Sequence, residues 1–539
     1  MLRTNITTTS LITLLVLVAA ARLPAADWPI WGKDASRNMV SEETGLPDSF
    51  DPGRMKEGSE EIDLATTENV KWVAKVGSQC YGNPTVSGGK VFVGTNNESP
   101  RNPDHVGDRG IIMCLDEQTG ELIWQLIVPK LGAGKVSDWE YLGICSSPGV
   151  DRDRVFVVTN RCEVVCLDTE GMVNGNDGPF MYEKLYMDGA HDGLKEQGTL
   201  PAPDDPSLAI GSDSQVADII WRFDMRDELG VFPHNIASNS VMVVGDTVYV
   251  ATSNGVDWSH TNIPSPKAPA FIALDRNTGE LVGEEGVGIS QRLFHCNWAS
   301  PAWGEVGGKG QVIFGAGDGF CYGFDPEPVE DEDGFLVFKE IWRYDCNPPR
   351  YRHRDDGKPQ KYATYNGPSE IISTPVFHNG RVYVAIGQDP EHGEGVGNLV
   401  CIDATKTGDI TQSGRVWEYD KINHTISTVS IADGLVFAAD YAGTVHCLDA
   451  ETGEFYWSHD TESHMWGSTL VGDGKVYLGA EDGRIVVLAA SKEKKLINET
   501  EMGVSVYSSP IAANGVVYIG TQTHLYAISD EEKAVAAGD

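Results

Sequence analysis

Residues 447–457, CLDAETGEFYW, contain an apolar strand end at Cys447-Leu448-Asp449, a Thr452-Gly453 turn and a following strand that carries Trp457. Residues 114–124, CLDEQTGELIW, repeat this pattern far earlier in the chain. Apolar and polar residues alternate on both sides of the turn, which is typical of short antiparallel strands joined by a tight connection. The two copies indicate that the chain is built from a repeated β unit.

A second pattern precedes these stretches and recurs along the chain. It consists of a small polar anchor residue, an apolar strand, a turn with Gly or Asp, and a β-branched or aromatic strand. Eight anchors are recognised: Asn83, Ser147, Ser238, Ser300, Thr374, Thr428, Ser468 and Ser509. A unit of four short strands cannot bury both of its faces alone, so neighbouring units must stack. The sequence therefore predicts an all-β, eight-bladed β-propeller of four-stranded antiparallel blades.

The ends of the repeat predict how the ring closes. The last copy stops at Leu525-Tyr526-Ala527-Ile528 without a Trp strand, whereas Val70-Lys71-Trp72-Val73 is an outer strand without a blade. Pairing the two would remove the exposed edges of an open sheet. We expect a secretory signal peptide over 1–26, an N-terminal segment over 27–68, the propeller over 69–529 with a long insertion at 171–215, and a disordered acidic tail over 530–539.

The N-terminal residues and the charge narrow the location and the partners. Arg3, an apolar run from Leu11 to Ala21 and small residues before Asp27 fit a secretory signal, which predicts an exported protein, periplasmic or extracellular. The run is too short to span a bilayer, so no membrane span is expected in the mature chain. With 79 acidic and 41 basic residues the net charge is −38, which repels nucleic acid. The expected partner is a protein or a small-molecule ligand.

These repeats resemble the PQQ-binding-like β-propeller family, which includes quinoprotein alcohol dehydrogenase-like and BamB-like proteins. The stretch from Asp27 to Asp34 is also similar to the opening segment of such proteins. The resemblance implies that outer-strand tryptophans dock between blades, namely Trp72, Trp124, Trp221, Trp342, Trp417 and Trp457. Gly283 and the region of Ile497 stand where the pattern has Trp, so weaker blade contacts are expected there.

The resemblance leaves several functions open. The family's dehydrogenases carry adjacent cysteines beside pyrroloquinoline quinone (PQQ), and this chain has no adjacent cysteines and no C-x-x-C-H sequence for haem. The first hypothesis is an exported module that binds a ligand or protein through its channel mouth and loops. The alternatives are a quinone- or metal-dependent oxidoreductase and a BamB-like envelope assembly scaffold. No catalytic residue is assigned, and PQQ, Ca²⁺ and a transition metal are the cofactors considered.

Aligning the eight anchors predicts a ring of side chains at one mouth of the channel. Four residues before each anchor stand Gln79, Gly143, His234, Cys296, Glu370, His424, His464 and Ser505. His234, Cys296, Glu370, His424 and His464 are types that bind transition metals or act as general acids and bases. The alternative is that these positions are polar because they face channel water and backbone amides.

A second set of positions predicts an aromatic floor for a planar or sugar-like ligand. Tyr81, Trp298, Trp466 and Tyr507 stand two residues before their anchors, and amide side chains accompany them at Gln79, Asn235 and Asn297. Packing of the channel wall is the alternative. Cys80 and Cys145 come from adjacent blades near this mouth and could pair.

The long insertion suggests a separate calcium hypothesis. Asp168, Glu170, Asn174, Asn176 and Asp177 cluster hard oxygen ligands among turn glycines, without the EF-hand spacing. The alternative is a plain turn-rich loop, because Asn, Asp and Gly favour turns in any case.

Overall fold

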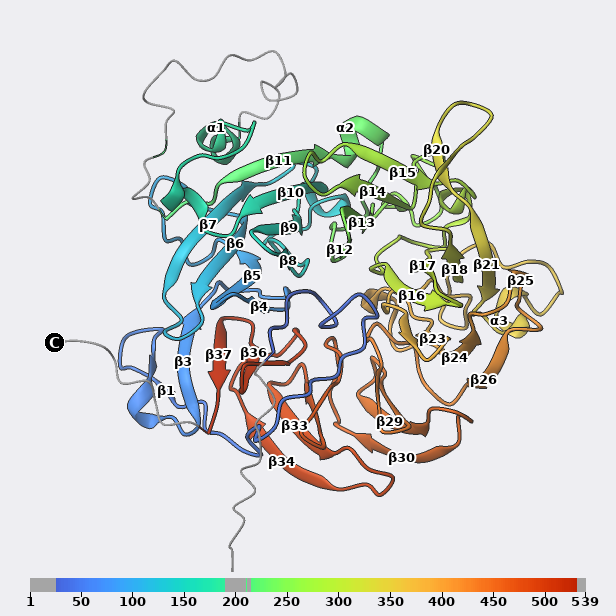
Figure 1. Ribbon diagram of the computed structural model, residues 1–539. Coiled ribbons are helices and arrows are strands. Elements are labelled where there is room, and N and C mark those ends of the chain that lie inside the picture. Colours follow the sequence, from blue (N-terminus) through green and yellow to red (C-terminus); the bar gives the residue numbers. More distant parts are fainter. Residues whose placement is uncertain (1–25, 190–209, 211–214, 531–539) are drawn as a thin grey trace, which may run out of the picture.

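The computed structural model describes residues 26–189, 210 and 215–530, which form eight blades of four antiparallel strands each, arranged around a central axis (Figure 1). Further strands extend two of the blades at the rim. The predicted eight-bladed propeller is confirmed. The predicted signal peptide and acidic tail lie outside the described residues except for Ala26 and Asp530. Within the described residues, no helix is both long enough and apolar enough to cross a bilayer.

Each blade runs from an inner strand at the axis to an outer strand at the rim. Blade 1 consists of β4 (Thr85–Ser87), β5 (Lys90–Asn96), β6 (Arg109–Asp116) and β7 (Leu122–Pro129), and blade 2 of β8 (Gly149–Asp151), β9 (Arg154–Val158), β10 (Glu163–Asp168) and β11 (Ile219–Asp224). Blade 3 consists of β12 (Met242–Val244), β13 (Thr247–Ala251), β14 (Phe271–Asp275) and β15 (Leu281–Glu285), and blade 4 of β16 (Ala302–Val306), β17 (Lys309–Gly315), β18 (Phe320–Phe324) and β21 (Glu340–Asp345).

The second half of the ring repeats this order. Blade 5 consists of β22 (Val376–His378), β23 (Arg381–Ala385), β24 (Leu399–Asp403) and β26 (Arg415–Tyr419), and blade 6 of β27 (Ser430–Ala432), β28 (Leu435–Ala439), β29 (Thr444–Asp449) and β30 (Phe455–Asp460). Blade 7 consists of β31 (Leu470–Gly472), β32 (Lys475–Gly479), β33 (Arg484–Ala489) and β34 (Leu496–Glu501), and blade 8 of β35 (Ile511–Ala513), β36 (Val516–Gly520), β37 (His524–Ile528) and β3 (Val70–Lys75).

Short elements decorate the blades. They are β1 (Arg54–Met55), β2 (Ile62–Asp63), β19 (Val329–Glu330), β20 (Leu336–Phe338), β25 (Gly408–Asp409), and the helices α1 (Glu183–Asp188), α2 (Met225–Leu229) and α3 (Pro349–Arg352). β20 and β25 come from connections within blades 4 and 5, and each adds a parallel strand to the rim of the preceding blade, β15 and β21 respectively. These insertions therefore tie neighbouring blades together.

The ring closes where the sequence predicts. β3 pairs with β37 in antiparallel register, with Trp72 opposite Ala527. One blade therefore combines strands from both ends of the chain, and neither end leaves an unpaired inner edge.

Outer-strand tryptophans occupy one equivalent position, opposite the small residue of the third strand, in six blades. In five of these blades the indole N–H donates to a backbone oxygen in the turn of the next blade, at 2.9–3.0 Å; the five are Trp72, Trp124, Trp221, Trp417 and Trp457. Trp342 instead donates to Gln311 within its own blade. The Thr-Gly turns form part of this contact, because a Cβ on Gly120 or Gly279 would lie 2.6 Å from the docked indole.

The two blades without this Trp are filled by other segments. In blade 3, Gly283 stands at the position of the Trp, and the buried Phe338 of β20 lies over Gly283. The ring centroids of Phe338 and Tyr249 are 6.1 Å apart. In blade 7 the position is Asn498, and the N-terminal segment covers the blade. There Tyr477 donates to the Pro47 oxygen and Lys475 pairs with Asp48. Neither seam is therefore open, although the sequence predicted weaker contacts at both.

Residues 28–41, which we call the strap, cross the axis of the ring (blue in Figure 1). The strap is hydrogen-bonded to the inner strand, or to the residue just before it, in all eight blades, through Val86, Val150, Val241, Trp303, Phe377, Ile431, Val471 and Ala512. The buried Arg37 donates to the backbone oxygens of Trp31, Val241 and Pro301. The strap closes one end of the channel.

Candidate functional site

The anchor residues form a belt of hydrogen bonds around the channel. Their links span 2.6–3.2 Å and run Ser147 to Ser240, Ser240 to Ser300, Thr374 to Thr428, Thr428 to Ser468, Ser468 to Ser509, Ser509 to Asn83, and Asn83 to Ser147. Seven of the eight pairs of neighbouring blades are joined in this way at the start of their inner strands, so the belt defines the register between those blades.

The belt corrects the predicted register of blade 3. Its anchor is Ser240, two residues before β12, rather than Ser238. The residue equivalent to Cys296 and Glu370 is therefore Ile236, and His234 lies two positions farther upstream. The sequence Ser238-Asn239-Ser240 offers two small anchors, and only the contacts with neighbouring blades decide between them.

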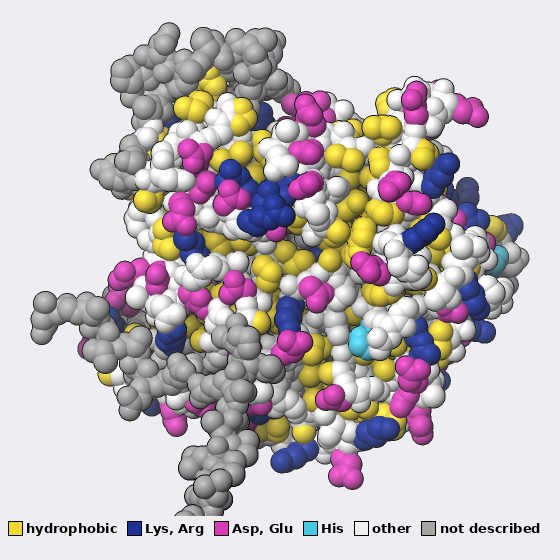
Figure 2. All heavy atoms as spheres, viewed as in Figure 1, with side chains coloured by type: hydrophobic (Ala, Val, Ile, Leu, Met, Phe, Trp, Pro, Cys, Tyr) yellow, Lys and Arg dark blue, Asp and Glu magenta, His cyan; other side chains and the backbone are white. Residues whose placement is uncertain are grey.

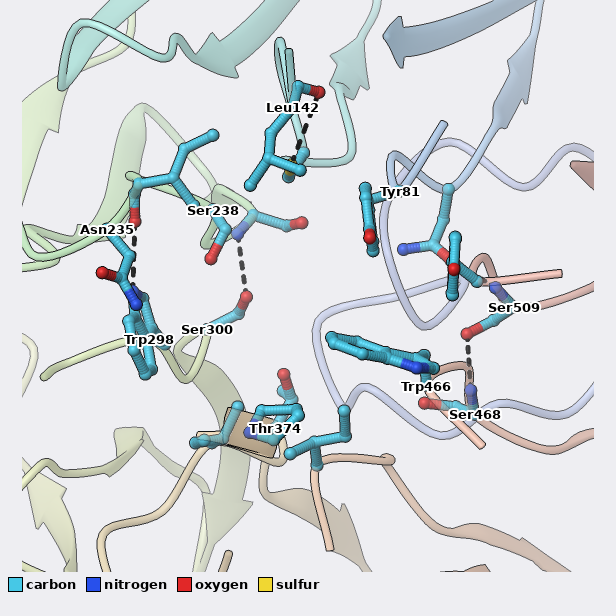
Figure 3. Close-up of a pocket in the computed structure, with 18 of the residues that line it drawn as sticks. Tyr81, Leu142, Asn235, Ser238, Trp298, Ser300, Thr374, Trp466, Ser468 and Ser509 are labelled. Carbon is cyan, nitrogen blue, oxygen red and sulfur yellow. Dashed lines mark hydrogen bonds between the residues drawn. The ribbon is translucent and has the colours of Figure 1, made fainter. Parts of the chain in front are cut away.

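A cavity of about 450 Å³ lies inside the belt (Figure 3) and extends to the strap, whose Trp31 lines it. Its wall contains seven of the eight anchors, all but Ser147, and the residues two positions before the anchors, including Tyr81, Trp298, Trp466 and Tyr507. Figure 3 shows Trp298 on one side and Tyr81 with Trp466 on the other. The aromatic side chains that the alignment grouped are thus brought together around one space.

The aromatic residues are held in defined orientations. Tyr81 stacks on Tyr507 with ring centroids 4.6 Å apart, and Trp466 meets both edge-on. Trp298 donates its indole N–H to the Ile236 oxygen. Asn235 lines the cavity and donates to Asp389. Asn297 is buried and bonded to the backbone of Asn254 and of Gly317. Gln79 accepts a hydrogen bond from Gln522. Asn297 and Gln79 are therefore outside the cavity wall.

The charges of the cavity do not fit PQQ. PQQ is a planar tricarboxylate, and sites for such anions present Arg, Lys or a helix N-terminus to each carboxylate. The described lining contains no Arg or Lys, and its charged members are Asp389 and Glu391. A trianion placed here would be repelled by both carboxylates, so we derive no quinone chemistry from this cavity.

A histidine cluster lies beside the cavity. One ring nitrogen from each of His234, His260 and His295 lies within 4.8 Å of the other two. His392 stacks on His295 with centroids 5.1 Å apart, and its Nε2 is 3.3 Å from Nδ1 of His260. Nδ1 of His295 lies 3.5 Å from the buried Glu370 carboxylate. The structure therefore joins His234 and Glu370, which the alignment selected, to three histidines that it missed.

Burial sets the protonation of this cluster. It lowers the pKa of His234 and of His295 to about 3, and it raises the pKa of Glu370 to about 8. At neutral pH both imidazoles are uncharged and keep a lone pair for a ligand or proton donor.

The other predicted metal ligands make separate contacts. The Cys296 thiol contacts the Ser253 oxygen, 3.1 Å away. His424 accepts from the backbone N–H of Gln388, and burial lowers the pKa of His424 to about 4. His464 is partly exposed between Glu394 and Glu481. The predicted five-residue ring therefore does not converge, because blades at opposite sides of the channel are separated by the cavity.

The acidic loop of blade 2 is partly assembled. Carboxylate oxygens of Asp168, Asp177 and Asp218 lie within 4.8 Å of one another, and burial raises the pKa of Asp218 to about 6. Asp168 pairs with Arg154. Of the remaining candidates, Asn174 donates to Asp177 of this cluster, whereas Glu170 pairs with Lys90 and Asn176 donates to Glu183. Calcium binding there stays a prediction.

All ten cysteines lie in the described residues and are free thiols. The suggested pairing of Cys80 with Cys145 is therefore wrong. Cys80 is buried with its thiol against the oxygens of Gly82 and Gly94, so it points back into its own blade.

Comparisons with known proteins agree on the repeat. The sequence family described as outer membrane protein assembly factor BamB matches residues 108–173, 363–459 and 408–535. BamB of Yersinia pestis is 22% identical over 330 residues, covering 60% of this chain and 70% of that protein. BamB of Escherichia coli K12 is 31% identical over 124 residues, covering 23% of this chain and 31% of that protein.

Quinoproteins are also similar, over shorter stretches. Quinohemoprotein alcohol dehydrogenase of Comamonas testosteroni is 23% identical over 145 residues, covering 24% of this chain and 20% of that protein. Among solved structures, BamB from Moraxella catarrhalis is 13% identical with a TM-score of 0.48, covering 85% of this chain and 96% of that one.

Proposed function

We propose that the chain is an exported protein-binding scaffold of the cell envelope, because its repeats match those of the PQQ-repeat β-propellers that include BamB. The similarity to proteins named outer membrane assembly factors supports a role in handling other polypeptides. The cavity supports this reading over a quinone-dependent oxidoreductase, because its charged lining residues are acidic.

The single observation that carries the proposal is a set of exposed aromatic residues around the open mouth. Tyr141, Trp258, Tyr362 and Tyr365 are exposed, and Trp258 and Tyr365 have 56% and 58% of their surface accessible. All four lie on loops that join the second to the third strand of a blade or lead into the next inner strand. In antiparallel blades those loops share the end opposite the strap. Exposed aromatic side chains at one rim are typical of protein-binding surfaces.

Charge indicates what kind of surface would bind. Asp389 and Glu391 line the cavity, and Glu394 and Glu481 flank His464 at the same mouth. Figure 2 shows acidic side chains spread over the visible face and interspersed with basic ones. Across the chain the net charge is −38. We expect the bound segment to be basic with apolar or aromatic anchors, and to bind more weakly as salt rises.

Site-specific photocrosslinking tests the proposal in the organism that makes the protein. A photoreactive amino acid replaces Trp258 or Tyr365 at the mouth, with Phe455 and Leu496 as matched exposed apolar controls outside the mouth. We expect adducts with an envelope protein from both mouth positions. The adducts should decrease when the other mouth residue is removed, by Tyr365→Ala with the photoreactive residue at position 258 and by Trp258→Ala with it at position 365. Equal adducts from the control positions, or none from the mouth, would contradict the proposal.

A further inference from the structure

Five buried polar atoms without a partner lie together beside the channel. They are Nε2 of His234, both ring nitrogens of His295 and both carboxylate oxygens of Glu370, and all three residues are fully buried. Leaving a buried polar group without a hydrogen bond costs about 1–3 kcal/mol. Native proteins leave few such atoms, and a group of them is typical of a site that an ion or ligand completes.

The distances fit a metal ion. One nitrogen each from His234, His260 and His295 lies within 4.8 Å of the others, and His392 adds Nε2 at 3.3 Å from His260 Nδ1. Two nitrogens that each lie about 2.05 Å from a tetrahedral Zn²⁺ are about 3.3 Å apart. The His260–His392 pair already has this separation. Metal binding would draw the nitrogens of His234, His260 and His295 together by up to about 1.5 Å.

The surrounding oxygens orient the lone pairs. Nδ1 of His234 is 2.6 Å from the Val256 oxygen, which can only accept a hydrogen bond. Nδ1 therefore carries the proton, and Nε2 keeps a lone pair that can bind a metal ion. Nδ1 of His295 faces Glu370. An oxygen acceptor on the second ring nitrogen is the usual arrangement around metal-binding histidines.

His392 follows the same rule through Gln388. The side-chain NH₂ of Gln388 donates to the Thr364 oxygen and the Ser369 hydroxyl. The side-chain oxygen Oε1 of Gln388 therefore faces Nδ1 of His392, 3.3 Å away. The Nδ1–H of His392 therefore donates to Gln388 Oε1, and Nε2 of His392 keeps its lone pair on the side that faces His260.

We propose that His234, His260, His295 and His392 bind one divalent transition-metal ion of the Zn²⁺ class, with Glu370 as the outer partner of His295. Three or four imidazoles favour Zn²⁺, Cu²⁺ and neighbouring ions over Ca²⁺ and Mg²⁺, which prefer oxygen ligands. The site differs from the predicted ring, because three of its histidines come from other positions. It does not depend on the proposed scaffold function.

An ion can reach the site from the surface. His260 lines a second cavity of about 390 Å³, which opens beside Thr261, Gln291 and Tyr362. Asp389, whose carboxylate interacts with His295, lines the channel cavity on the other side. The cluster thus lies between two cavities, and Asp389 favours a cation there.

Metal titration of the full-length purified chain tests the inference. After dialysis against a chelator, Zn²⁺ is titrated in competition with a chromophoric chelator, and Co²⁺ is added separately as a spectroscopic probe. We expect one ion per chain, a Zn²⁺-dependent rise in melting temperature, and visible Co²⁺ bands typical of a tetrahedral site. A chain that binds less than a fifth of an equivalent and shows no shift overturns the inference.

Variants separate ligands from structural histidines. His295→Leu removes two unpartnered nitrogens, so we expect the metal-free protein to melt no lower than wild type while its Zn²⁺ response is lost. Glu370→Gln should weaken Zn²⁺ about 10–100-fold, as outer-partner changes do. His260→Ala, on a partly exposed loop, should abolish the Co²⁺ bands.

A matched control is His459→Ala, a nearly buried histidine in β30 of blade 6 whose Nε2 also lacks a partner. This variant should bind Zn²⁺ as wild type does. Should His295→Leu fail to fold, His260→Ala and Glu370→Gln still decide the question. Zn²⁺ binding with wild-type affinity in both of them, or an equal loss of binding in His459→Ala, overturns the assignment.

Discussion

The indole N–H of Trp72 donates to the backbone oxygen of Glu117 at 2.9 Å, so the strand that completes blade 8 is bonded directly to blade 1. The ring of Trp72 lies on Gly120, which has a φ of +74°, and a Cβ there would be 2.6 Å from the indole. The contact that closes the propeller thus has the same chemistry as the contacts between its other blades.

Trp72→Ala should lower the free energy of unfolding by about 3–5 kcal/mol, because it removes a buried aromatic side chain and leaves a cavity between blades. Denaturant titration measures this loss. Gly120→Ala should also destabilise through its clash and its positive φ. Trp258→Ala, at an exposed position, is the control and should change stability little. Similar effects of Trp72→Ala and Trp258→Ala would show that the seam contributes nothing.

Phe338→Ala should destabilise blade 3 by about 3–5 kcal/mol, as a large aromatic-to-alanine change in a core does. Phe338 is buried and stacks on Phe271 at 5.6 Å, where other blades use a Trp of their own. Leu336→Ala, two residues earlier on β20 and exposed, is the matched control. If both variants melt alike, the rim insertion does not replace the missing Trp.

Arg37→Ala should loosen the strap. Its guanidinium donates to three buried backbone oxygens, and each acceptor left alone costs about 1–3 kcal/mol. Hydrogen exchange followed by mass spectrometry should show faster exchange at Trp28 and Ser41, whose amides bond to Val86 and Val471. Arg54→Ala, at an exposed position, should leave these rates unchanged. Unchanged protection in Arg37→Ala would contradict this role.

Glu285 should make stability depend on pH. Burial raises its pKa to about 7 in the folded state, above the usual value of 4.5, although Val287 and Ile289 donate to it. The unfolded chain releases this proton first, so rising pH between about 4.5 and 7 lowers stability, by up to roughly 3 kcal/mol. Above pH 7 the loss is complete.

Glu285→Gln removes this titration, so its melting temperature relative to wild type should rise between pH 5 and pH 8. Glu280→Gln, exposed in the same blade, is the control and should show a constant difference. A constant difference for Glu285→Gln as well would mean that Glu285 titrates normally.

Thiol labelling should distinguish Cys145 from the other nine cysteines. Cys145 is partly exposed and lines the cavity, whereas the others are buried. Burial raises its thiol pKa to about 12, so its reaction with a maleimide at pH 8 should be slow. We expect one labelled thiol per native chain, lost in Cys145→Ser, and ten after unfolding. Rapid labelling of several native thiols would contradict the compact ring.

The sequence predicted what the repeat dictates. Trp124 and Trp457 lie in the same local pattern, and Trp72 without its own blade indicated how the ring closes. It did not predict contacts that depend on neighbouring blades. The anchor of blade 3 was misplaced at Ser238 because Ser240 has the same chemistry, and the belt of hydrogen bonds that selects Ser240 exists only in the assembled ring.

The histidine cluster shows the same limit. His260 and His392 lie on insertions, where no repeat register applies, and His295 stands one position before the aligned Cys296. A search for histidines in connections that share one end of the blades would have found all three. The strap was also missed, because its partners are spread from Val86 to Ala512 and no local pattern reports them.

The strap has a consequence for how the protein is made. Residues 28–41 are synthesised before any blade, yet their bond to Ala512 must wait until the chain has reached blade 8. A chain that stops before blade 8 therefore keeps part of this segment unbonded beside an unfinished sheet. Proteases that cleave exposed backbone would remove such chains first, so docking of the earliest residues marks a molecule as complete.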